Sequence, residues 1–136
     1  MTRTRIAGLA ALALLAGCQT QPEQLRVPPA PLEGQTLTYR DTVTRARMWA
    51  TNAVEAFYVD KWAEVESSAN GLEETARFLP KSLDIPDSRK STLEVQATAL
   101  QQDAQDLRRF ARNNDEKKAN ETLQRIHQRV RDLRPE

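Results

Sequence analysis

After residue 35, apolar residues recur at alternating spacings of three and four in four segments of the chain. This spacing places the apolar side chains on one face of an α-helix, so we predict helices over residues 36–58, 61–79, 92–112 and 116–133. The stripes are Tyr39, Val43, Ala46, Ala50, Ala53 and Phe57; Trp62, Val65, Ala69, Leu72, Ala76 and Leu79; Leu93, Ala97, Leu100, Ala104, Leu107 and Ala111; and Ala119, Leu123, Ile126, Val130 and Leu133.

Residues with strong preferences at helix ends support these boundaries. Pro80 ends the second helix, because proline lacks the amide hydrogen that a helix interior needs. Ser91, with Glu94 three residues later, forms a capping-box signature at the start of the third helix. Asp115 is the candidate N-cap of the fourth.

None of these helices could bury its apolar face alone, so we predict an all-α fold, an up-down-up-down four-helix bundle over residues 36–134. Short connections are expected near residues 59–60 and 113–114. In the longer third connection, Leu83 and Ile85 are expected to pack over one end of the bundle. A single long coiled-coil oligomer is the alternative architecture, and the prolines and short breaks argue against it.

The N-terminal segment has the pattern of an export signal. Two arginines, Arg3 and Arg5, precede an apolar run over residues 6–16 that is too short for a permanent membrane span. The run ends in Leu15-Ala16-Gly17-Cys18, which resembles a bacterial lipobox. The resemblance implies that residues 1–17 are a cleaved lipoprotein signal peptide and that Cys18 is lipidated. The alternative is a plain signal peptide with a chance cysteine.

The resemblance also implies a location for the protein. In Gram-negative lipoproteins an aspartate after the lipidated cysteine retains the protein at the inner membrane, and here the residue is Gln19. We therefore expect a lipid anchor in the outer membrane, with the domain facing the periplasm. Two or three acyl chains give lasting attachment, whereas a single chain does not.

A proline-rich segment follows the anchor, with Pro22, Pro28, Pro29 and Pro31 in residues 18–35. Proline favours extended conformations, and at about 3.1 Å per residue this linker would reach roughly 50 Å. We interpret it as a tether that holds the domain away from the membrane. A ligand for a proline-recognising protein is the alternative, without support from any repeat.

Charge gives no indication of a nucleic-acid partner. The formal net charge is +1, and loss of Arg3 and Arg5 with the leader leaves 18 basic side chains against 19 acidic ones. Nucleic-acid binding needs a clustered basic footprint. The last helix is locally basic, with Arg125, Arg129, Arg131 and Arg134, but acidic residues interleave, so we interpret this face as solvated.

His127 is the single histidine of the chain, and it raises the possibility of a haem site. Each helical residue advances by about 100°, which places His127 roughly 80° from the centre of the core stripe, at its edge. The pattern His127-Gln128-Arg129-Val130-Arg131 resembles the last helix of cytochrome c-prime and of the soluble b-type four-helix cytochromes, with valine in place of an aromatic residue.

The chain departs from the cytochrome pattern at the positions that hold haem. Leu123 and Ile126 occupy the positions of the cysteines that hold haem covalently in cytochrome c-prime, so covalent haem is excluded. The b-type relatives use a methionine of the first helix as second ligand, and Met48 is the candidate here. Met48 lies opposite the apolar stripe, so we expect it to face solvent. His127 alone would give five-coordinate haem b.

Other chemistry finds little support in the sequence. A zinc site needs more histidines or cysteines than His127 offers once Cys18 is lipidated. A di-iron bundle needs glutamate three residues before histidine, and that residue is Gln124. The pairs Glu73-Glu74 and Asp103/Asp106 lie off the apolar stripes, which indicates solvated faces. We expect no enzymatic activity.

The function predicted from the sequence is that of a non-catalytic protein-interaction or scaffold module on a membrane-anchored periplasmic lipoprotein, with an unknown periplasmic protein as partner and no cofactor. The alternative is a non-covalent haem-binding or electron-transfer protein that uses His127. A contiguous exposed apolar patch around Trp49, Tyr58 or Leu83 would favour the protein partner.

Overall fold

The computed structural model describes residues 36–134, which form four long α-helices and two short helical turns. The long helices are α1 (Tyr39–Tyr58), α2 (Trp62–Phe78), α4 (Leu93–Arg112) and α5 (Glu116–Asp132). A 3-10 turn, η1 (Leu79–Lys81), follows α2, and one α-helical turn, α3 (Asp87–Lys90), lies in the longer connection. The described residues contain no β-strand, which confirms the all-α prediction.

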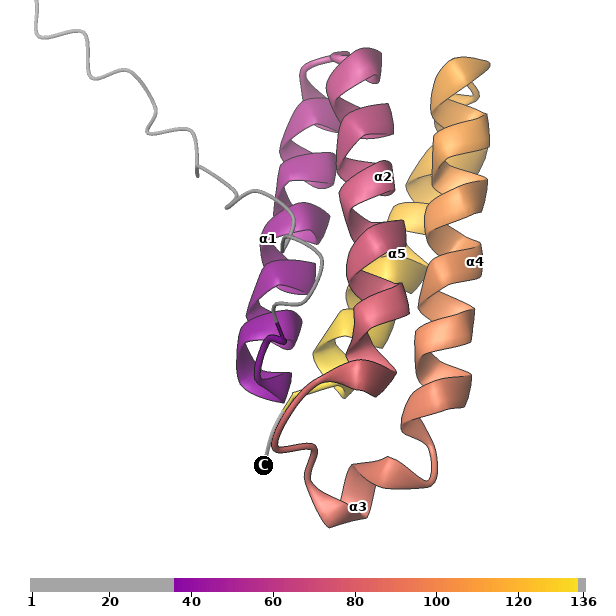
Figure 1. The fold of residues 1–136 in the computed structure, drawn as a ribbon. Coiled ribbons are helices and arrows are strands. Elements are labelled where there is room, and N and C mark those ends of the chain that lie inside the picture. Colours follow the sequence, from indigo (N-terminus) through magenta and orange to yellow (C-terminus); the bar gives the residue numbers. More distant parts are fainter. Residues whose placement is uncertain (1–35, 135–136) are drawn as a thin grey trace, which may run out of the picture.

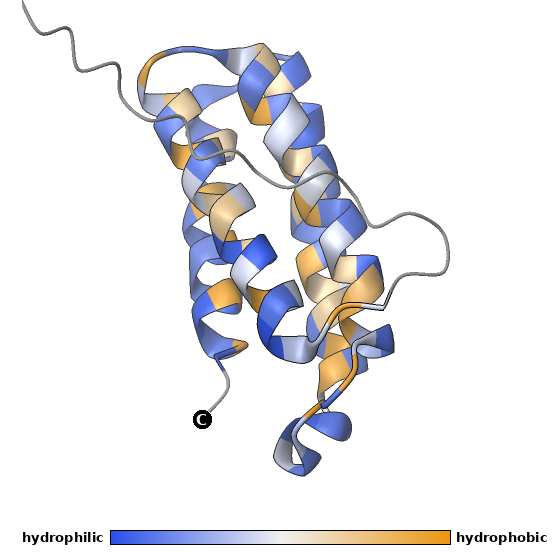
Figure 2. Ribbon diagram, turned by 60° about the vertical axis from the view of Figure 1, so that its left-hand side comes forward, coloured by the Kyte–Doolittle hydropathy of each residue, from blue (hydrophilic) through white to orange (hydrophobic). Residues whose placement is uncertain are grey.

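The four long helices pack side by side (Figure 1). α2 packs against both α1 and α4, whereas α5 packs against α4 and, less extensively, against α1. Hydrophobic and hydrophilic positions alternate along each long helix (Figure 2). All predicted stripe residues are buried except Trp62, which is half-buried against the core. The stripes are therefore confirmed, and the α1–α5 seam is the loosest of the four.

The short connections reverse the chain within a few residues. Asp60 and Asn114 adopt φ values of 56° and 49°, in the left-handed region that aspartate and asparagine tolerate better than most side chains. Asp115 then begins α5, and its carboxylate accepts a hydrogen bond from the backbone N–H of Lys118 at 3.2 Å. This bond lowers the pKa of the Asp115 carboxyl. The N-cap prediction for Asp115 is confirmed.

The capping box predicted from Ser91 and Glu94 is not formed. Ser91 has φ −73° and ψ −25°, because it ends α3, and the N-cap position of α4 is Thr92, whose side chain makes no capping hydrogen bond. An N-cap residue needs extended backbone so that its oxygen reaches the first free amides of the helix. Because the sequence analysis did not predict α3, it did not predict the helical backbone of Ser91, which prevents this residue from capping α4.

Backbone hydrogen bonds hold the longer connection against the start of α1. Leu83 donates its N–H to the carbonyl of Leu37 at 2.9 Å and accepts the N–H of Tyr39 at 2.7 Å. The Leu83 side chain is 51% exposed, so its predicted packing over the bundle end is wrong. Ile85 does pack against the core, as predicted.

Further hydrogen bonds join the start of α1 and the longer connection to the end of α5. The buried Tyr39 hydroxyl donates to the carbonyl of Leu133 at 2.7 Å. The Arg89 guanidinium donates to the carbonyls of Asp132 and Arg134 at 2.8 and 3.0 Å. These carbonyls lie at the C-terminal end of α5, where they lack intrahelical partners. The two ends of the described chain therefore meet at one end of the bundle.

Candidate functional site

The predicted lipid anchor lies outside the described part of the chain. Cys18, the signal over residues 1–17 and the linker over 18–35 precede residue 36, so each stays a prediction from the sequence. Within residues 36–134, no helix has the length and apolar character needed to cross a membrane.

His127 lies on the exposed surface of α5, where it lines a groove between α1 and α5. The groove has a volume of about 540 Å³ and follows the loosest seam of the bundle. The edge position predicted for His127 is therefore confirmed. The imidazole is not enclosed between helices.

The groove has an apolar floor and a polar rim. Its buried or half-buried apolar side chains are Ala50, Val54, Phe57, Leu123 and Val130. Its exposed polar side chains on α5 are Asn120, Gln124, His127 and Gln128. Most of this floor is buried, because Ala50, Leu123 and Val130 are at most 3% exposed. Half-buried Val54 is the apolar floor residue that a ligand could reach most readily.

Arginines gather at one end of the groove. Arg47, Arg131 and Arg134 line it, and an adjoining hollow is lined by Arg40, Arg47 and Arg134 together with Val43 and Thr44. Neither lining includes an aspartate or glutamate. The ion pairs of the described residues all use other basic side chains. This end is therefore cationic.

The opposite end of the groove carries an aromatic residue at the tip of the bundle. Tyr58 lines both the groove and a second hollow, which Phe57, Asp60, Glu116, Lys117 and Asn120 complete. Tyr58 is 75% exposed, and its neighbour Val59 is 60% exposed. We call the residues 58–60, 116, 117 and 120 the tip surface.

The apolar patch predicted around Trp49, Tyr58 or Leu83 is not a single surface. Tyr58 lies at the turn between α1 and α2, whereas Leu83 lies in the connection at the opposite end of the bundle (Figure 1). Trp49 is half-buried against Gly71 of α2, and its indole Nε1 is buried without a hydrogen-bond partner. Of the three predicted residues, Tyr58 lies next to a second exposed apolar residue, Val59, which the prediction did not name.

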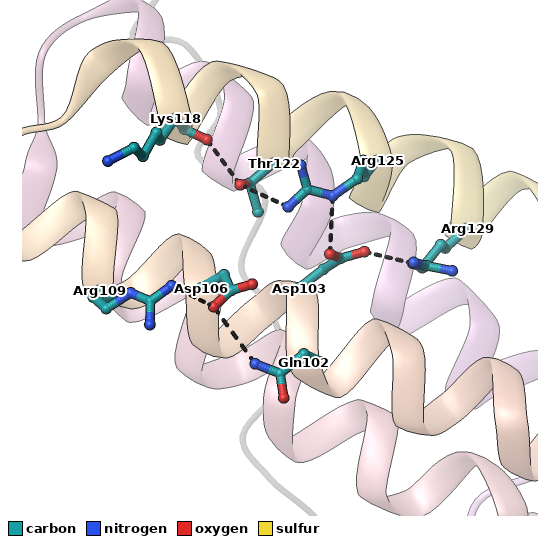
Figure 3. Close-up of polar contacts among 8 residues, drawn as sticks. All are labelled: Gln102, Asp103, Asp106, Arg109, Lys118, Thr122, Arg125 and Arg129. Atoms are coloured by element: carbon teal, nitrogen blue, oxygen red, sulfur yellow. Dashed lines mark hydrogen bonds and ion pairs between the residues drawn. The ribbon is translucent and has the colours of Figure 1, made fainter.

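Asp103 is buried, which corrects the prediction of a solvated face. Its carboxylate accepts hydrogen bonds from Nε of Arg125, at 3.1 Å, and from Nε of Arg129, both on α5 (Figure 3). Arg125 also donates to the hydroxyl of the buried Thr122. Two of the arginines interpreted as solvated thus clamp α5 to α4. The role of Asp103 is structural.

Glu73 is the second buried carboxylate that the sequence placed on a solvated face. It accepts a hydrogen bond from Arg77 on its own helix, α2. It also accepts hydrogen bonds from Gln105 and Arg108 of α4, and these two join α2 to α4. Burial alone raises the pKa of this carboxyl, but the hydrogen bond from Gln105 and the charges and hydrogen bonds of Arg108 and Arg77 outweigh it. The net pKa is lowered, so Glu73 is a fixed anion rather than a proton donor near neutral pH.

The structure does not bring the second predicted haem ligand to His127. Met48 is half-buried on α1, although it was expected to face solvent, and it is not among the residues that line the groove. Within residues 36–134, no group of three or more histidine, cysteine, aspartate or glutamate side chains is arranged to hold a metal ion.

The arginine end of the groove was not predicted from the sequence. Arg40 and Arg47 are seven residues apart on α1, so they share a helix face. Arg131 lies in the last turn of α5, and Arg134 follows the end of that helix. These positions can be read from the sequence, but they do not indicate that the arginines of α1 lie near those at the end of α5. Comparison of the chain with models of protein families, with curated proteins and with solved structures finds no match.

Proposed function

We propose that this chain is a lipid-anchored protein of the bacterial cell envelope whose bundle is a non-catalytic interaction or scaffold module. The lipobox-like Leu15-Ala16-Gly17-Cys18 supports the anchor, and Gln19 supports the periplasmic face of the outer membrane. The short turns at residues 59–60 and 113–114 support the up-down-up-down order of the helices.

The tip surface is the observation that carries the interaction proposal. Tyr58 and Val59 stand out from the bundle end, and Asp60, Glu116 and Lys117 surround them with charges of both signs. An apolar centre with a polar rim is the usual arrangement of a protein interface, and tyrosine is enriched in such centres. A periplasmic protein is the proposed partner, docked over this end.

A photo-crosslinking amino acid at position 58 of the full chain tests this docking in the cells that make the protein. The matched control is the same amino acid at Val95, which is 72% exposed and lies on α4 away from the tip. A discrete cross-linked band at position 58 but not at 95 is expected. The same pattern at both positions would remove the tip as the docking surface.

The anchor has its own test. Cys18→Ser is expected to abolish fatty-acid labelling and to move the protein from the membrane fraction to the soluble one. Gln19→Asp keeps the cysteine, and by the lipoprotein resemblance it should move the protein from the outer to the inner membrane. Labelling that persists in Cys18→Ser would contradict the proposal.

Non-covalent haem b at His127 is the second candidate function. The observation in its favour is that His127 lines the same groove as Arg47, Arg131 and Arg134, because guanidinium groups bind carboxylates such as the haem propionates. The exposed imidazole and the absence of Met48 from the groove lining make the fit incomplete.

A further inference from the structure

The α1–α5 groove separates charge from apolar surface along its length. Its cationic end has Arg47, Arg131 and Arg134, with Arg40 in the adjoining hollow. Its apolar floor extends from there toward the tip along α1, from Ala50 to Phe57. Seven residues of α-helix span about 10 Å. A ligand that follows this groove meets positive charge at one end and, toward the tip, an apolar floor that is flanked by uncharged polar side chains.

The arginine end is available to an anionic group. Arg131 donates to the side chain of Gln128 at 2.5 Å, which leaves most of its guanidinium donors for a ligand. Arg40, Arg47 and Arg134 have no ion-pair partner among residues 36–134. By contrast, Arg125 and Arg129, which lie on α5 with Arg131, are already paired with Asp103.

From this separation we propose that the groove binds a dispersed single-chain amphiphile with an anionic headgroup. The phosphate or carboxylate lies between the guanidinium groups of Arg47, Arg131 and Arg134. The alkyl chain lies over Val54 and the ring of Tyr58, which are the least buried apolar and aromatic side chains of the lining, and displaces water from them. The groove volume of about 540 Å³ is within the range of small-molecule sites.

The proposal does not depend on the lipid anchor or on a protein partner. His127 lies on the rim between the two halves and is not part of the headgroup site, so amphiphile binding does not require the histidine. This separates the amphiphile from haem, whose specific binding would need the His127 imidazole.

Isothermal titration calorimetry with decyl phosphate, below its micellar concentration, tests the inference. The protein is the chain from residue 18 with Cys18→Ser, which keeps every residue of the described bundle and needs no detergent. Saturable one-to-one binding is expected. Decyltrimethylammonium, which has the same alkyl chain with a cationic head, should give no saturable heat.

Variants locate the two halves of the site. Arg131→Gln/Arg134→Gln should weaken decyl phosphate binding by about tenfold or more, since charge-assisted hydrogen bonds are lost. Arg109→Gln/Arg112→Gln removes the same charge from exposed side chains of α4 outside the groove and should leave binding within about twofold. Val54→Asp places a carboxylate on the floor and should abolish binding, while His127→Ala should not change it.

Three outcomes would overturn the proposal. They are the absence of saturable decyl phosphate binding, equal affinity in the two arginine double variants, and equal binding of the cationic amphiphile. A fourth is sedimentation with phosphatidylglycerol vesicles without any binding of free decyl phosphate, which would assign the arginines to a membrane surface. Circular dichroism of each variant establishes that it is folded, so that a loss of binding reports on the groove.

Discussion

The indole ring of Trp49 on α1 lies directly against Gly71 of α2. A Cβ atom at position 71 would come within 2.1 Å of Cε2 and 2.4 Å of Cδ2 of Trp49, closer than any side chain can tolerate. Only glycine allows α2 to approach the tryptophan at this point. The contact explains why a residue that weakens helices stands in the middle of α2.

Gly71→Ala is expected to destabilise the bundle by about 1–3 kcal/mol, because the cost of overpacking exceeds the gain in helix propensity. Urea unfolding measures the change. Ser67→Ala, on the exposed face of the same helix, is the control and should stay within about 0.5 kcal/mol. In a Trp49→Ala background the penalty of Gly71→Ala should disappear, and a penalty that persists would place its origin elsewhere than the ring.

Asp103 should contribute more to stability than Asp106, which lies one turn away on the same helix and has a less buried side chain. Removal of Asp103 leaves Arg125 and Arg129 without their partner, but their side chains are 46% and 41% exposed and regain water. Asp103→Ala is therefore expected to cost about 1–2 kcal/mol in urea unfolding. Asp106→Ala breaks an ion pair within one helix and should cost less than about 0.5 kcal/mol. Equal costs would mean that the clamp between α4 and α5 adds nothing.

Glu73 should make the bundle sensitive to acid. Its pKa in the folded protein is lowered from the ordinary value of 4.5, so its stabilising contribution is present above that value and is lost as pH falls through the folded pKa. Glu73→Gln should reduce stability at pH 7 and flatten its decline below about pH 4.5. Urea unfolding at several pH values measures both effects. Glu94→Gln, on the exposed side of α4, should leave the acid decline unchanged.

A haem titration followed by visible absorption tests the second candidate function. Because His127 is exposed and Met48 does not line the groove, we expect no saturable one-to-one Soret band, and the same weak absorption in His127→Ala. A saturable band that His127→Ala removes would establish non-covalent haem binding instead.

The sequence predicted the helices well because burial of apolar side chains is a local, periodic signal. The stripe from Leu93 to Ala111, for example, is buried throughout. The same signal cannot detect Glu73 and Asp103, since a periodic analysis treats every carboxylate as solvated. Their partners lie on other helices, between 22 and 35 residues away, except for Arg77.

The groove could not be predicted from the sequence, because it also depends on which helices lie side by side. His127 could be placed at the edge of the core from its angle on the helix alone. The arginine end depends on Arg47 of α1 lying near Arg131 of α5 and Arg134 just beyond it, which is a property of helix packing. Leu83 was misplaced because the backbone pairing of its connection with residues 37 and 39 could not be seen in its composition.

The hydrogen bond from Tyr39 to the carbonyl of Leu133 has a consequence for chain connectivity. It places the entry and exit of the bundle within the length of one side chain of each other. A short peptide linker between these points can therefore close the domain into a ring. New ends opened at Asn113-Asn114 would give a circular permutant with all four long helices intact.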